Sequence, residues 1–209
     1  MSASLKIALV GATGGLGRAI FEQASARGHA VTAVVRDVEK ARSMFPGAMI
    51  DQVSVEDGHG LVEAFQGHDC VIEVVSNSLR PHGVAHIIAA SESAQVPIFV
   101  ACGGAGCLMT KEGSDAIRLC DAPGLSFLKN LTQMHLGVQS IAFASSIPTV
   151  MQICPPSMSD GALTSGFKPS KNISHGVQSA SYSDFASVLL LSLESPLTYN
   201  RSMIGLNRI

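Results

Sequence analysis

The sequence has little charge, and the charge that it has is balanced. Only 14% of its 209 residues are charged, and the formal net charge is −2 at pH 7. A nucleic-acid footprint needs clustered Lys and Arg, so we expect no nucleic-acid partner. The apolar fraction of 46% argues against a disordered chain. The low charge also indicates that a ligand or a second subunit covers part of the apolar surface. The sequence is therefore compatible with either a monomer or a homodimer.

Long apolar runs, disulfide patterns and metal motifs are also lacking. No stretch approaches the roughly 20 apolar residues of a membrane span, and the N-terminus lacks the basic segment of a signal peptide. The five cysteines are odd in number and form no Cys-x-x-Cys, which favours reduced thiols in a cytoplasmic protein. His82 and His86 lie four apart, but two ligands alone do not make a zinc site. We therefore predict no membrane span and no metal.

Buried-strand and helix patterns alternate along the chain. This alternation predicts βαβ units and an α/β fold, a Rossmann-type doubly wound parallel sheet in a single domain of residues 1–209. Residues 161–174 are expected as a loop with short strands that lies over the carboxyl edge of the sheet. Residues 155–209 are expected to supply most of the substrate side. The predicted strands are 5–10, 30–35, 48–53, 70–75, 97–101, 149–154 and 202–206. The predicted helices are 16–27, 38–44, one ending at 61–65, 84–94, 125–144 and 183–193.

A glycine-rich turn, Gly11-Ala-Thr-Gly-Gly-Leu-Gly17, follows the first strand and opens a helix. Gly11 permits the tight turn, Gly14 lets the backbone approach a pyrophosphate, and Gly17 lets helix and strand pack closely. The amides at the start of the following helix then face the phosphates. This context predicts a dinucleotide site and not a bare glycine turn. The other candidate cofactor-binding residues of the turn are Thr13, Gly15 and Leu16.

The tip of the second strand indicates which dinucleotide binds. An enzyme that uses NAD usually places an acid there to hold the ribose 2′-hydroxyl, whereas this chain has Arg36. A guanidinium at the tip would pair with a 2′-phosphate, and Lys40, one helical turn on, adds a second positive charge. Asp37 between them is expected to cap the next helix. We therefore predict NADP(H) as the cofactor.

The Gly-x-x-Gly-x-x-Gly spacing resembles the extended and atypical branches of the short-chain dehydrogenase superfamily. The resemblance extends to segments after the fourth, fifth and sixth strands and to the start of the last helix. It is strongest to the NAD(P)H-binding, NmrA-like atypical group that includes biliverdin IXβ reductase/flavin reductase. The segments that carry it are Val71-Ile72 with Ser76, residues 101–107, residues 154–167 and residues 181–186.

This resemblance implies further cofactor contacts and one departure at the third strand. Family members often carry Gly-Asp at the tip of that strand, where the Asp approaches the adenine. Here the positions read Val53-Ser54, so Ser54 is expected to take that place. The cofactor-binding residues that the resemblance implies are Ser54, Val55, Ser76, Gly103, Gly104 and Pro155.

The largest departure from the superfamily concerns catalysis. Typical short-chain dehydrogenases use Tyr-x-x-x-Lys, in which the lysine lowers the pKa of the tyrosine. Neither Tyr182 nor Tyr199 is followed four residues later by lysine, because Ala186 and Met203 occupy those positions. The usual alcohol and ketone chemistry is therefore not expected. Hydride transfer to an extended conjugated acceptor needs little acid–base help from the protein.

Two other residues are candidates for chemistry. His135 lies on the helix that normally carries the tyrosine and lysine, and Cys107 follows the turn after the fifth strand. Each has a plainer interpretation, as a packed histidine and as a small buried thiol. We expect an NADPH-dependent reductase of a planar conjugated small molecule such as a flavin, a quinone or a tetrapyrrole. The alternatives are a non-enzymatic NADP(H) sensor or interaction protein, and an isomerase or cyclase that uses the same pocket.

Overall fold

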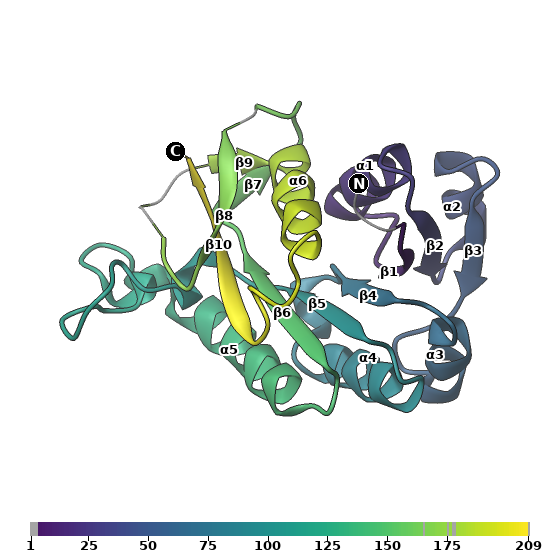
Figure 1. Cartoon of the computed structure of the whole chain (residues 1–209), viewed down its shortest axis with the longest axis horizontal. Coiled ribbons are helices and arrows are strands. Elements are labelled where there is room, and N and C mark those ends of the chain that lie inside the picture. Colours follow the sequence, from purple (N-terminus) through teal and green to yellow (C-terminus); the bar gives the residue numbers. More distant parts are fainter. Residues whose placement is uncertain (1–3, 165, 175, 177–178, 209) are drawn as a thin grey trace.

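A mostly parallel sheet of eight strands forms the centre of the computed structural model, which describes residues 4–164, 166–174, 176 and 179–208 (Figure 1). The strand order is β3-β2-β1-β4-β5-β6-β10-β8, and only β8 runs antiparallel to its neighbour. The fold is therefore the predicted Rossmann-type α/β fold. The strands are β1 (Lys6–Val10), β2 (Ala30–Val35), β3 (Met49–Gln52), β4 (Cys70–Glu73), β5 (Ile98–Cys102), β6 (Thr149–Cys154), β8 (Phe167–Lys171) and β10 (Ser202–Arg208).

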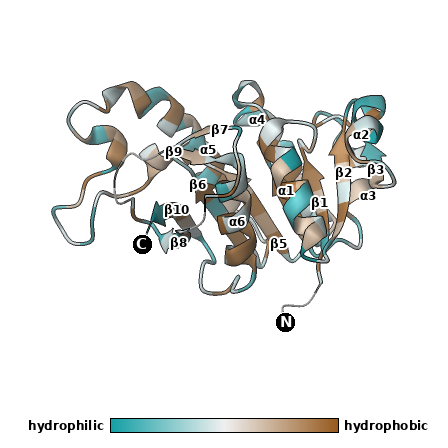
Figure 2. Ribbon diagram, turned by 90° about the horizontal axis from the view of Figure 1, so that it is seen from above, coloured by the Kyte–Doolittle hydropathy of each residue, from teal (hydrophilic) through white to brown (hydrophobic). Residues whose placement is uncertain are grey.

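Helices cover both faces of the sheet, so the inner strands are apolar on both sides. In β1, Ile7 and Leu9 pack in one core layer, and Ala8 and Val10 pack in the other. Helices α1, α2 and α6 contribute to the first layer, and α3, α4 and α5 to the second (Figures 1 and 2). The helices are α1 (Gly15–Ala26), α2 (Val38–Met44), α3 (Gly58–Phe65), α4 (His82–Ser93), α5 (Lys129–Ala144) and α6 (Tyr182–Leu193).

The strand order reverses between β1 and β4. The chain moves outward from β1 through β2 to β3, and then returns to the other side of β1 with β4. In open α/β sheets, such a switch point leaves a crevice outside the carboxyl ends of the strands. The turn after β1 and the segments after β4 and β5 meet at this edge, where the sequence placed the candidate site.

The second half of the chain departs from the prediction. Residues 161–174 were expected as a loop with short strands over the sheet edge, but residues 167–171 form β8 within the main sheet, at its edge and paired with β10. Pro169 and two lysines obscure this strand in the sequence, and such residues are typical of edge strands. A second small sheet, β7 (Ser157–Ser159) with β9 (Ser179–Ser181), was not predicted. Ser165 lies outside the described residues.

Candidate functional site

Two glycines of the turn after β1 are required by the fold itself. Gly11 has a φ of +92°, and a Cβ added there would lie 2.9 Å from the backbone oxygen of Val74. A Cβ on Gly17 would lie 2.3 Å from the backbone oxygen of Gly11. Both positions therefore exclude side chains because of protein contacts alone, which agrees with the turn and packing roles expected for them.

Gly14 differs, because nothing in the protein demands a glycine there. Its backbone is extended, with φ −77° and ψ 162°, and it is the N-cap of α1. The nearest protein atom to an added Cβ is the backbone oxygen of Gly11, at 3.5 Å, which is ordinary contact. A side chain would instead occupy the space in front of the first turn of α1, which carries no acidic residue. That space suits a phosphate at a helix N-terminus.

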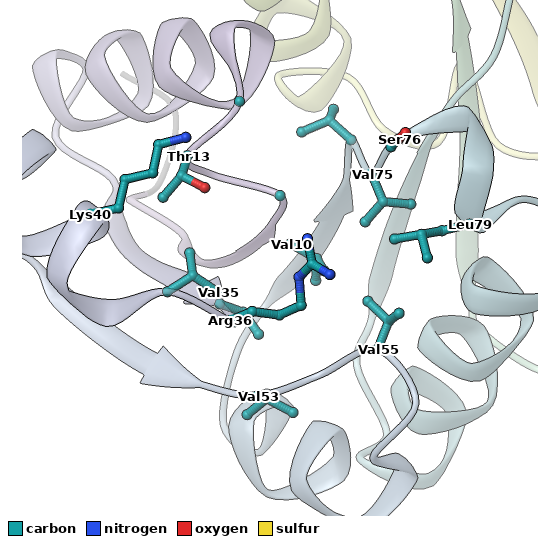
Figure 3. A pocket seen from close by; sticks show the side chains of 14 residues that line it. Val10, Thr13, Val35, Arg36, Lys40, Val53, Val55, Val75, Ser76 and Leu79 are labelled. Atoms are coloured by element: carbon teal, nitrogen blue, oxygen red, sulfur yellow. The ribbon is translucent and has the colours of Figure 1, made fainter.

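A cavity of about 250 Å³ opens beside this turn (Figure 3). The side chain of Arg36 extends into it from the end of β2, and Lys40 of α2 lies at its rim (Figure 3). Neither cation forms an ion pair with another described residue, whereas nearby Arg42 pairs with Glu39 at 3.1 Å. The lining residues are Val10, Gly11, Thr13, Gly14, Val34, Val35, Arg36, Lys40, Val53, Val55, Val74, Val75, Ser76 and Leu79.

Asp37 is occupied by the backbone of the next helix. Its Oδ1 accepts a hydrogen bond from the amide of Lys40 at 3.0 Å, which makes it the N-cap of α2. This is the capping role expected for Asp37. Arg36 is thus the charged side chain that the strand tip presents to the cavity.

Of the other residues expected to contact the cofactor, some line the first cavity and others only support the backbone around it. Val55 and Ser76 line the cavity, but Ser54 does not. The hydroxyl of Ser54 accepts from the amide of Glu56 at 3.3 Å, which holds the local turn. His86 of α4 steadies the same segment, because its Nδ1 lies 3.1 Å from the backbone oxygen of Val55. The segment predicted to contact the cofactor thus borders the first cavity through Val53 and Val55, but not through Ser54.

A second cavity, of about 310 Å³, lies beyond β5 and β6. It brings together Gly104, His135 and Pro155, three of the residues expected near the cofactor and substrate. No side chain that lines it is Asp, Glu, Lys or Arg, and Phe127 at its rim is 74% exposed. The full lining is Gly104, Ala105, Gly106, Leu119, Phe127, Leu128, Leu131, Thr132, His135, Pro155, Pro156 and Ser157.

Gly103 and Cys107 flank this loop without lining the second cavity. A Cβ on Gly103 would lie 2.7 Å from Sγ of Cys154, so the glycine is needed for close packing. Cys107 is fully buried, and its thiol donates to the backbone oxygen of Thr132 at 3.8 Å. A hydrogen bond from Cys154 lowers the pKa of Cys107. The structure thus places Cys107 as a packed thiol behind the loop, which is the plainer of its two interpretations.

Tyr182 lies at the phosphate turn, which the sequence did not indicate. A Cβ on Gly15 would lie 2.8 Å from Cε2 of Tyr182, so the aromatic ring rests directly on the backbone of Gly15. A further bond joins the two helices, because Nε2 of Gln23 donates to the backbone oxygen of Ser183 at 2.7 Å. The tyrosine lies within the capping box of Ser181 and Asp184, and no local pattern reveals its contact with Gly15, which is distant in sequence.

A buried ion pair beneath the second cavity was also missed. Nη2 of Arg80 lies 2.7 Å from Oε2 of Glu73, and both side chains are almost completely buried. The only sequence signal was a carboxylate at the end of an otherwise apolar strand. Among the described residues, there is no group of three or more His, Cys, Asp or Glu suited to a metal ion. In that same part of the chain, no helix is long and apolar enough to cross a membrane.

Comparison with protein-family models gives one match over most of the chain. The model describes NAD(P)H-binding proteins, and it matches residues 11–196. A curated relative, an uncharacterized chloroplastic protein of Arabidopsis thaliana, is 38% identical over 79 residues. That match spans 36% of this chain and 28% of the relative.

Solved structures share the whole fold at low identity. A protein described as an NADH-flavin reductase, from Streptococcus pneumoniae, has a TM-score of 0.78 and 24% identity, and the match covers 99% of this chain and 100% of that one. A protein described as an epimerase, from Bacteroides thetaiotaomicron, has a TM-score of 0.81 and 24% identity, with 99% and 98% covered. An anaerobilin reductase of Escherichia coli O157:H7 has a TM-score of 0.79 and 18% identity, with 97% of each chain covered.

Proposed function

The chain belongs to the NAD(P)H-binding family, and we propose that it is an NADPH-dependent reductase of a planar, conjugated small molecule. The observation that carries the proposal is the pairing of two cavities on one edge of the sheet. One offers a glycine turn and two unpaired cations. The other is mostly apolar and contains no charged side chain. A charged dinucleotide suits the first, and a flat apolar acceptor suits the second.

The residues of the first cavity fit the phosphates of the cofactor. The amides at the start of α1 would receive the pyrophosphate over Gly14, where an added Cβ meets no close protein atom. Arg36 and Lys40 would face the 2′-phosphate of NADPH, for which a guanidinium is a suitable partner. The nicotinamide end would then lie between the segments that follow β4 and β5.

The residues of the second cavity would position the acceptor. NADPH supplies a hydride when bound, that is, one hydrogen with two electrons. Gly104 and Ala105 leave room on the side of the loop that faces the cavity, and Leu131 and Phe127 supply apolar surface for a flat ring system. Holding two rings in contact and excluding water accelerates such a transfer without a tyrosine acid. The proton that completes the reduction comes from solvent.

The test is NADPH oxidation by the purified protein against a panel of free flavins, quinones and linear tetrapyrroles. Simple aliphatic ketones serve as negative acceptors, because they need the absent tyrosine–lysine pair. We expect turnover with at least one conjugated class and none with the ketones. Tight NADPH binding without oxidation by any acceptor would contradict the proposal and favour the sensor. Oligomeric state and localisation in the cytoplasm stay predictions.

A further inference from the structure

A layer of polar side chains crosses the central strands beneath the second cavity. Glu73 on β4 is the register partner of Ala101 on β5, and Ala101 is the partner of Gln152 on β6. Val71 and Val150, two residues earlier on the outer two of these strands, pack in the core layer of α4 and α5. Since strand side chains alternate, Glu73 and Gln152 point to the same helix-covered face. Both are completely buried there.

Glu73 is held by three hydrogen bonds. Its carboxylate accepts from Nη2 of Arg80 at 2.7 Å, from the amide of Cys102 at 3.0 Å, and from the amide of Val75 at 3.3 Å. Burial raises the pKa of Glu73 to about 7, against the opposing effect of Arg80 and these bonds. A buried pair of this kind is weak evidence for stability, because desolvation offsets the attraction between the charges. It does fix Arg80 between the ends of β4 and β5 and the start of α4.

Several buried polar atoms of this layer have no hydrogen-bond partner among the described residues. They are Nε and Nη1 of Arg80, Nδ1 of His135 and Oε1 of Gln152. Gln152 is tied to α5, since its Nε2 donates to the backbone oxygen of His135 at 2.9 Å. A guanidinium only donates hydrogen bonds, so Nε and Nη1 of Arg80 both require acceptors.

The two ring nitrogens of His135 lie in different surroundings. The edge with Cδ2 and Nε2 faces the loop after β5, because a Cβ on Gly104 would lie 3.1 Å from Cδ2 and 3.4 Å from Nε2. Gly104 and His135 both line the second cavity. Nδ1, on the other side of the ring, is buried. Burial and the charge of Arg80 lower the pKa of His135 to about 4, so the ring is neutral at pH 7.

We propose that Arg80, anchored by Glu73, is a positioning residue that holds His135 in the tautomer with its proton on Nε2, facing the second cavity. A buried water that accepted from Arg80 and donated to Nδ1 of His135 and to Oε1 of Gln152 would satisfy all three side chains. His135 then presents a neutral N–H donor to the substrate. It does not act as an imidazolium acid.

This assignment narrows the substrate class, and that step rests on the proposed function. When a hydride adds to a conjugated acceptor, two electrons arrive and negative charge develops on the atom at the far end of the conjugation. A fixed donor stabilises that charge most where the acceptor atom is a carbonyl oxygen, and a proton from solvent then neutralises it. We therefore assign the cavity to conjugated carbonyl compounds, of which quinones are the simplest.

The tautomer is tested by NMR with protein labelled with ¹⁵N in its histidines, with the His135 signals assigned from His135→Gln. We expect wild-type His135 to carry its proton on Nε2 and to stay neutral at pH 6. Arg80→Met should shift it toward the Nδ1–H tautomer or let it protonate near pH 6, and Arg80→Lys, which keeps the charge, should shift it less. The exposed His59 is the internal reference and should not change. A proton on Nδ1 in the wild type, or a spectrum of His135 unchanged in folded Arg80→Met, would overturn the proposal.

Reductase activity gives a second test of the donor role of His135, and its outcome does not depend on the NMR experiment. With a quinone acceptor, His135→Phe should lower kcat about tenfold or more and leave NADPH affinity unchanged, whereas His135→Gln, which keeps an N–H donor, should retain most of it. Equal loss in both variants would contradict the donor role. If the wild type reduced no acceptor, the proposed function would fail while the NMR experiment still decided the tautomer.

Discussion

The two cavities open at the same edge of the sheet, but different kinds of segment line them. The first is made from backbone and from residues close in sequence, chiefly the turn of Gly11–Gly17 and the strand tip at Arg36. The second takes its walls from the loop after β5, from α5 and from the segment after β6. A phosphate site can be built from one short segment, because the backbone amides at the start of a helix bind the phosphate. A site for a flat substrate instead needs a cavity that matches the form of that substrate. The walls of such a cavity come from segments that are far apart in the sequence.

The largest effect should come from Gly14→Val, which breaks the first cavity alone. A Cβ at Gly14 meets no close protein atom, so the variant should fold and lose measurable NADPH binding in titration calorimetry. Gly17→Ala is the matched contrast, since its Cβ would lie 2.3 Å from the backbone oxygen of Gly11. That variant should lose stability by roughly 1–3 kcal/mol, as for overpacking. Retained binding by folded Gly14→Val would show that the phosphates lie elsewhere.

Gly104→Leu should break the second cavity and spare the first. The backbone there is extended, with φ −151° and ψ 150°, so the substitution strains no dihedral angle. The new side chain would crowd His135 and fill space in the second cavity. We expect turnover to fall at least about tenfold while NADPH still binds. Unchanged turnover with the best acceptor would show that the second cavity is not the acceptor site.

Arg36→Asp tests the charge of the first cavity. Removing the partner of a 2′-phosphate and adding a negative charge should weaken NADPH binding by roughly 2–3 kcal/mol, with little effect on NADH. Arg42→Ala is the control, because Arg42 is exposed and already paired with Glu39. Calorimetric titrations with both dinucleotides give the comparison. Equal affinity of the wild-type protein for NADPH and NADH would contradict the assignment of Arg36.

Asp184→Ala should loosen the segment after β6. Asp184 accepts from the amide of Ser181 at 2.9 Å and from the amide of Thr164 at 2.8 Å, which joins that segment to the start of α6. Removing it leaves the buried amide of Ser181 unpaired and frees the amide of Thr164, and we expect a loss of roughly 2 kcal/mol in the free energy of unfolding. Asp160→Ala, at an exposed carboxylate, should change it by less than about 0.5 kcal/mol. Urea unfolding measures both, and equal midpoints would refute the role of Asp184.

The smallest effects should come from Tyr182→Phe and Tyr199→Phe. The ring of Tyr182 rests on Gly15 through its carbon atoms, and phenylalanine preserves that contact. We expect NADPH binding and turnover to change less than about twofold in each variant, since positioning and not a tyrosine acid drives the transfer. Steady-state kinetics is the measurement. A folded variant that binds NADPH but no longer reduces the acceptor would refute this view of both cavities.

Local sequence patterns predicted most of the helices and strands, because apolar periodicity and capping each depend on residues only a few positions apart. The bounds of β2, α2 and β6 agree with those expected, because apolar runs and capping residues such as Asp37 set them. β8 was expected only as an unplaced short strand within residues 161–174, because Pro169 interrupts the strand pattern and is typical of an edge strand. Which strand occupies an edge is decided by packing against β10 and not by the strand itself.

The glycine turn after β1 and the charge at the tip of β2 could be predicted from the sequence alone. Gly14 and Arg36 lie where they were expected, since a turn and the strand that precedes it are contiguous. Three features depend on the tertiary structure: Ser54 turns away from the cavity, Cys107 is packed, and Tyr182 rests on Gly15. The tertiary structure also brings the charge of Arg80, paired with buried Glu73, near enough to lower the pKa of His135. Such contacts depend on how strands and helices align across the whole sheet, and no local propensity records that alignment.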